Sequence, residues 1–132
     1  MKYLGIDYGT RRTGVAISPD SRVAVVKEVI HTTSQNKTIE RIKQIVAEDG
    51  IECIVVGLPV SMQNNPTEMT EKAKLFVEKL RNHVSIPVQT IDERFTTDMA
   101  EKLLRGIKHE ERDQVSAQIL LQNFLDSLSA AS

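Results

Sequence analysis

Apolar residues in the first quarter of the chain form three short runs separated by turn residues. The runs cover residues 2–7, 13–18 and about 23–31, and they are rich in β-branched side chains. The connections at residues 9–12 and 19–21 contain the Gly, Pro, Asp and Ser residues that favour tight turns. Strands joined by such short connections are expected to form an antiparallel meander.

The next segments show the apolar spacing of α-helices. In the first of them Gly50 is expected to end a helix whose apolar residues recur every three or four positions: Ile39, Ile42, Ile45 and Val46. A second helix is expected to begin at Pro66, with Asn65 as its cap and Glu68 completing a capping box. One face of that helix is apolar: Met69, Ala73, Phe76, Val77 and Leu80.

Two short apolar runs near these helices have the composition of strands. Residues 54–58 are continuously apolar, as expected of a strand covered on both faces, and residues 87–91 form the last strand. Helices are then expected at about 96–106, ending near Gly106, and at about 111–129. The element order is therefore βββ-α-β-α-β-α-α.

This order predicts an α/β fold with a five-stranded mixed sheet and helices on both faces. Three antiparallel strands are followed by parallel strands, because right-handed crossovers through helices join parallel neighbours. The first strand is expected at the centre of the sheet. Binding sites in open sheets of this kind lie at the carboxyl ends of the central strands.

Length and composition indicate one globular domain spanning residues 1–132. The chain is 40% hydrophobic and 27% charged, and no apolar run approaches the about 20 residues that span a membrane. Residues 1–7 do not resemble a signal peptide, and the single Cys53 is interpreted as a buried hydrophobe in a reducing compartment. A cytoplasmic location is therefore expected.

Three acidic residues are expected at element ends that meet at one edge of the sheet. Asp7 ends the first strand, Glu93 follows the last strand, and Asp113 begins the apolar face of the last helix. That face contains Asp113, Ala117, Leu120, Leu121, Phe124 and Leu128. Carboxylates gathered in this way can hold divalent metal ions for phosphodiester hydrolysis.

Each acid also has a structural explanation when it is taken alone. Asp7 can cap its own turn, Glu93 can be an exposed loop residue, and Asp113 can interact favourably with a helix dipole. Gly9 and Gly14, which let a phosphate or another backbone approach closely, favour a functional role for Asp7.

Three sequence blocks resemble the YqgF/RuvX family, which is related to Holliday-junction resolvases and to ribonuclease H-like proteins. They are residues 7–16, residues 54–59 together with 92–97, and residues 113–126. The resemblance implies a ribonuclease H-like fold and a divalent-metal nuclease acting on structured nucleic acid. It assigns the family's acidic triad to Asp7, Glu93 and Asp113. The segment from Gln63 to Pro66 departs from the family's usual Asn-Gly turn, which leaves that loop's shape open.

The resemblance also implies a cofactor and a substrate. The triad would be the catalytic and metal-binding site, with Mg²⁺ as its metal and Mn²⁺ able to substitute. The substrate implied is pre-16S rRNA, processed at its 5′ end in ribosome biogenesis, or a Holliday junction. The candidate nucleic-acid-binding residues are Arg11, Arg12, Arg94, Lys102, Arg105, Lys108 and Arg112.

Two other classes of protein remain open at this stage. An actin-like ATPase or sugar kinase would share the Asp7–Gly9 loop but needs two such domains, and a binding module would keep the fold without cutting. The net charge of −1 argues weakly against nucleic-acid coating. His31, His83 and His109 are interpreted as ordinary surface or strand-end residues. The sequence does not decide whether the substrate is RNA or DNA, or whether the protein is a monomer or a homodimer.

Overall fold

A computed structural model describes residues 1–59, 68–92 and 109–131, and in the last range it describes the side chains of 114–129. The elements are β1 (Tyr3–Asp7), β2 (Arg12–Ser18), β3 (Val25–His31), α1 (Gln35–Asp49), β4 (Cys53–Leu58), α2 (Glu68–His83), β5 (Val88–Asp92) and α4 (His109–Ala131). The helix predicted at 96–106 and the predicted capping residues Asn65 and Pro66 lie outside the described residues.

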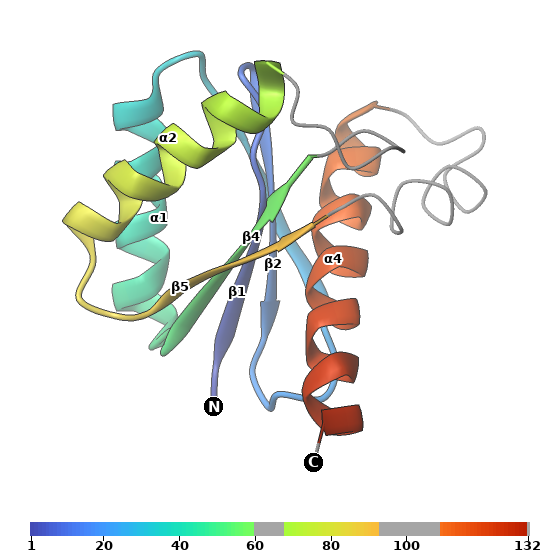
Figure 1. Ribbon diagram of the computed structural model, residues 1–132. Helices are drawn as coiled ribbons and strands as arrows, with labels where there is room; N and C mark the ends of the chain where they lie inside the picture. Colours follow the sequence, from blue (N-terminus) through green and yellow to red (C-terminus); the bar gives the residue numbers. More distant parts are fainter. Residues whose placement is uncertain (60–67, 93–108, 132) are drawn as a thin grey trace.

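The sheet has five strands in the order β3-β2-β1-β4-β5. β1, β2 and β3 pair antiparallel, whereas β1 pairs with β4, and β4 with β5, in parallel. Helices α1 and α2 cover one face and α4 covers the other (Figure 1). The predicted meander, the mixed sheet and the central position of β1 are all confirmed.

Residues of each strand alternate between two hydrophobic cores. Leu4 and Ile6 of β1 face the core beneath α1 and α2, whereas Tyr3 belongs to the core beneath α4. By the two-residue period of a strand, Gly5 and Asp7 point to the α4 face with Tyr3. Cys53 is buried in the α4-side core, as predicted, and burial raises the pKa of its thiol.

A β-bulge interrupts the alternation of β3. Val15 pairs with Glu28 but Ala16 pairs with Val26, so Lys27 is an extra residue. Because of this extra residue, the alternation of side chains between the two faces of the sheet is shifted by one position at the bulge. This shift explains the loose apolar alternation in this part of the sequence. The strand also begins at Val25, two residues later than predicted.

Helix α1 begins and ends at the residues that its sequence favours. Ser34 is the N-cap, and its Oγ accepts a hydrogen bond from the Lys37 N–H at 3.3 Å. Gly50 ends the helix in the left-handed conformation with φ 65°, and its N–H donates to the Val46 carbonyl. The prediction that Gly50 stops this helix is confirmed. In the described part of the chain no helix is long and apolar enough to cross a membrane.

Helix α4 packs directly on the backbone of β1 at Gly5. A Cβ atom added there would lie 2.7 Å from Leu121 Cβ and 3.3 Å from the Ala117 carbonyl oxygen. The Tyr3 ring contacts the Phe124 ring edge-on, with centroids 5.7 Å apart. Gly5 is therefore the residue that allows α4 to approach the centre of the sheet.

The predicted apolar face of the last helix is correct for its first four described members and wrong at its end. Ala117, Leu120, Leu121 and Phe124 are buried, whereas Leu128 is 43% exposed. Leu128 lies beyond most of the core. Leu125, on the neighbouring row of side chains along the helix, is buried instead.

Gly9 makes possible the short connection between β1 and β2. A Cβ on Gly9 would overlap the Arg12 carbonyl oxygen, so the close approach that the glycine permits is that of another backbone. The buried Thr13 hydroxyl spans the same turn, accepting from the Gly9 N–H at 3.5 Å and donating to the Gly9 carbonyl at 3.4 Å.

Replacement of Gly9 by alanine is expected to lower the free energy of unfolding by about 1–3 kcal/mol, because the turn must open to accommodate the new methyl group. Urea denaturation followed by circular dichroism measures this loss. Asn36→Ala, at an exposed position of α1, is the control and should change the midpoint little. An unchanged midpoint for Gly9→Ala would mean that the turn relaxes without cost.

Candidate metal-dependent active site

Asp7 lies at the carboxyl end of the central strand. It is the last residue of β1, is half-buried, and points to the α4 face by strand alternation. Its backbone pairs with Gly14 of β2, so no side chain stands directly opposite it on that strand. The predicted position of Asp7 in the fold is therefore the observed one.

The next two strands bring their carboxyl ends to the same edge. Ile6 pairs with Val56, so Asp7 is level with Gly57, which in turn pairs with Ile91. At about 4.8 Å between neighbouring strands, about 10 Å separates the Asp7 and Ile91 positions. Gly57 contributes no side chain between them. Ile91 packs against the α4-side core, so this row faces α4.

Glu93 itself lies outside the described residues. β5 ends at Asp92, which is exposed and pairs with Leu58 at the edge of the sheet.

The backbone of α4 runs antiparallel to β1. Tyr3 meets Phe124, and Gly5 meets Ala117 and Leu121, so residue numbers fall along α4 as they rise along β1. Asp7 is two residues, or about 6.7 Å, beyond Gly5, which corresponds to about four residues of helix. This register makes Asp7 level with about residues 113–117 of α4.

Asp113 is the fifth residue of α4, which begins at His109, two residues earlier than predicted. It precedes the buried Ala117 by one helical turn and therefore belongs to the same side of the helix. The N-terminal end of α4 and the carboxyl ends of β4 and β5 lie at the same end of the molecule (Figure 1). The side chain of Asp113 is outside the described set.

Tyr8 anchors the end of β1 from the opposite face. Its ring stacks on Phe76 of α2 with centroids 4.3 Å apart and an interplanar angle of 15°. The Tyr8 hydroxyl accepts a hydrogen bond from Gln35 Nε2 at 3.0 Å, and Gln35 Oε1 accepts one from Lys79 Nζ at 2.8 Å. Both helices of that face therefore help to fix the residue next to Asp7.

The residue types of the triad fit a hard divalent cation. Mg²⁺ prefers carboxylate oxygens, and a half-buried Asp7 at a sheet edge offers two of them. Among the described residues no group of three His, Cys, Asp or Glu side chains is gathered, and Asp7 is the one triad member whose side chain belongs to them.

The predicted basic residues are described only in part. Arg11 and Arg12 are exposed at the turn that follows Asp7. Arg112 lies in α4, where only its backbone is described. The others lie outside the described residues: Arg94, Lys102, Arg105 and Lys108.

Two glutamines hold α4 in position, and neither was predicted from the sequence to have this role. Gln122 accepts from the Ala24 N–H at 2.9 Å and donates to the Arg22 carbonyl at 2.8 Å. Gln118 donates to the Ala24 carbonyl at 2.9 Å. Their spacing of four residues beside the apolar face was the available signal. These bonds fix the helix that carries Asp113 against the β2–β3 connection.

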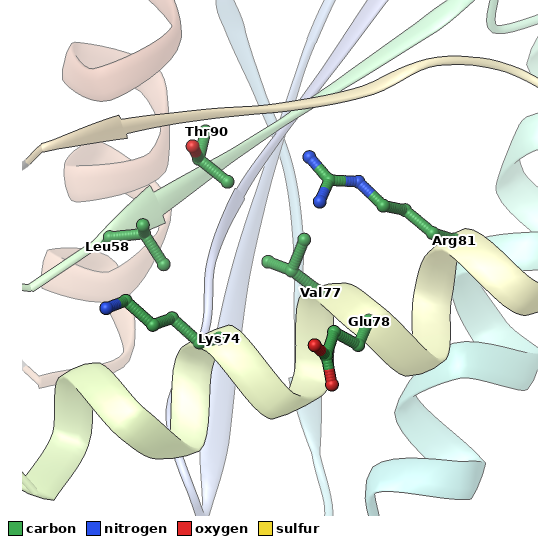
Figure 2. A pocket seen from close by; sticks show the side chains of 6 residues that line it. All are labelled: Leu58, Lys74, Val77, Glu78, Arg81 and Thr90. Carbon is green, nitrogen blue, oxygen red and sulfur yellow. The ribbon is translucent and has the colours of Figure 1, made fainter.

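A pocket of about 220 Å³ lies on the other face of the sheet, between α2 and the ends of β4 and β5 (Figure 2). It is lined by Leu58, Lys74, Val77, Glu78, Arg81 and Thr90. The Arg81 guanidinium donates to the Val88 carbonyl at 3.2 and 2.8 Å and so covers part of the β5 edge. Because it faces away from Asp7, the pocket is separate from the predicted site.

Comparisons with known proteins match this chain over nearly its whole length. A family model described as RuvX, Holliday junction resolvase, matches residues 1–127. A protein of Desulforamulus reducens is 36% identical over 134 residues, covering 96% of this chain and 98% of its own length. A protein of Chloroflexus aggregans is 39% identical over 131 residues, covering 94% and 92%. Both are named, provisionally, as pre-16S rRNA nucleases.

A solved structure shows the same fold. Thermus thermophilus RuvC, in complex with a Holliday junction substrate, matches with a TM-score of 0.63 at 16% identity, covering 100% of this chain and 98% of that chain. This likeness confirms the predicted ribonuclease H-like fold. With the match over nearly its whole length and close relatives above 30% identity, the chain belongs to the RuvX family.

Proposed function

We propose that this protein is a divalent-metal-dependent nuclease that hydrolyses phosphodiester bonds at the 5′ end of pre-16S rRNA. Its family makes it a nucleic-acid-cleaving enzyme. The RNA substrate is favoured over a DNA junction because relatives at 36–39% identity have the rRNA nuclease name, whereas the RuvC likeness is one of fold. Ribosome biogenesis would place the enzyme in the cytoplasm.

The observation that carries the proposal is the meeting of three element ends at one edge of the sheet. Asp7 ends β1 on the α4 face, β5 ends one residue before Glu93, and the packing register of α4 on β1 makes Asp113 level with Asp7 within about one turn. Carboxylates that converge from such positions are suited to a metal-dependent hydrolase.

Asp7, Glu93 and Asp113 would hold Mg²⁺, and Mn²⁺ is expected to substitute because it accepts the same oxygen ligands. When bound, the metal supplies an activated water and charge stabilisation for the leaving oxygen. The protein's own part is to fix the acids. Gly5 brings α4 close to β1, and Tyr8 immobilises the end of β1. Arg12, exposed beside this edge, would bind a substrate phosphate.

Cleavage assays on two substrates test this proposal. Purified protein is incubated with a structured 5′-extended 16S rRNA precursor and, in parallel, with a four-way DNA junction, each with Mg²⁺, with Mn²⁺ and with EDTA. We expect cleavage of the RNA in both metals and none in EDTA. Preferential cleavage of the junction would instead support the resolvase function, which requires two active sites and hence a homodimer.

Retained binding without cleavage of either substrate would contradict the nuclease proposal and favour a binding module. Native mass spectrometry of the same preparation distinguishes monomer from homodimer.

A further inference from the structure

Arg12 and His31 stand side by side at the edge of the sheet that carries Asp7. They are a directly opposed pair in the antiparallel register of β2 and β3, and both side chains are exposed. Directly opposed residues have Cβ atoms about 4.5–5.5 Å apart. The Thr32 N–H donates to the Arg11 carbonyl at 3.2 Å, which continues the ladder past this pair and fixes it.

The pair points to the same face of the sheet as Asp7. Asp7 pairs with Gly14, and Arg12 lies two residues from Gly14 on β2, so both have the same strand phase. His31 shares that phase because it is paired with Arg12. The bulge at Lys27 determines the orientation of His31. Strand alternation counted from Val25 without the extra residue would place His31 on the opposite face of the sheet.

The acidic residue of β3 does not oppose this pair. Glu28 points to the α1 face, where its carboxylate bonds the Arg41 guanidinium at 2.7 and 3.0 Å. The hydrogen bonds that Arg41 donates to Glu28, together with the negative charge of that carboxylate, raise the pKa of the Arg41 guanidinium. The negative charge of Glu28 is therefore both neutralised and turned away from Arg12 and His31.

We propose that Arg12 and His31 form a phosphate-binding pair that holds the nucleic-acid strand as it leaves the cleavage edge across β2 and β3. β3 is two strand spacings, or about 10 Å, from β1. The inference rests on the proposed nuclease function and adds His31 and a substrate path to it.

The two side chains offer complementary donors for phosphate oxygens. The planar arginine guanidinium can bind two oxygens of one phosphate, and the imidazole donates through a ring N–H and carries positive charge when protonated. Such contacts position the strand and read no sequence.

The test measures binding separately from cleavage. Affinity for the structured rRNA precursor is measured in EDTA over a range of salt concentrations, for wild type, His31→Gln, His31→Lys and His83→Gln. His83 is the matched control because it is an exposed histidine at the end of α2. This end of the helix leads to the start of β5, at the opposite end of the sheet from Asp7. We expect His31→Gln to weaken binding about 3- to 10-fold, and His83→Gln to leave it unchanged.

His31→Lys is expected to bind at least as tightly as wild type, with a salt slope steeper by about 0.7–0.9, because it adds a permanent charge at a phosphate contact. Wild-type affinity for His31→Gln, or a salt slope unchanged by His31→Lys, would overturn the inference. If wild type binds and cleaves while both His31 variants behave like it, only this inference fails. If wild type neither binds nor cleaves, both the proposed function and this inference are contradicted.

Discussion

Replacement of Asp7 by asparagine is expected to abolish metal-dependent cleavage while the protein remains folded. The substitution keeps the shape of the side chain and removes the charge that would hold the metal at the centre of the edge. Loss of an outer-shell partner alone costs about 10- to 100-fold in metal affinity or activity, so loss of a direct ligand should exceed 100-fold. Cleavage rate on the rRNA precursor in Mg²⁺ is the measurement.

Thermal denaturation of the same variant in EDTA distinguishes a catalytic from a structural role. Its melting temperature should equal or exceed that of wild type, because repulsion among the proposed acids is relieved. Asp126→Asn, an exposed position near the other end of α4, is the matched control and should cleave normally. Full cleavage by Asp7→Asn, with contaminating nuclease excluded, would rule Asp7 out of the site.

Replacement of Gly5 by valine is expected to produce the largest loss of stability. The first carbon of any side chain at this position would lie 2.7 Å from Leu121 Cβ, a separation that packed carbon atoms do not tolerate. Alanine should cost about 1–3 kcal/mol and valine more, out of a total of about 5–15 kcal/mol for a typical domain. Cleavage should fall as well, because α4 and Asp113 move away from β1.

Urea denaturation of wild type, Gly5→Ala and Gly5→Val measures this graded effect. Thr90→Val is the control, since it places the same β-branched side chain at an exposed position of β5. The order wild type, alanine, valine in falling stability is predicted. Equal stability of all three would show that α4 does not depend on close contact at Gly5.

Much of the sheet could be predicted because local signals and the tertiary structure agree. Gly50 ends α1 in the left-handed conformation that favours glycine, and the continuous apolar run of β4 is buried on both faces. The position of Asp7 followed from β1 being central. In each case a single short segment contained the whole physical reason.

Contacts that depend on long-range register could not be predicted in the same way. Gly5 is an ordinary strand residue until α4 is docked on it, and Gln122 bonds backbone atoms about 100 residues away. The alignment of His31 with Arg12 depends on a bulge at Lys27 that no turn residue announces. The exposure of Leu128 follows from where the core ends, which helical spacing alone does not show.

The most direct test of the central claim is the position of bound Mn²⁺ in crystals of this protein, located by anomalous scattering. We predict a peak beside the Asp7 carboxylate, with oxygens of Glu93 and Asp113 completing its protein ligands at distances of about 2.0–2.3 Å. A peak elsewhere, or a fully occupied site that leaves Asp7 uncoordinated, would contradict the account.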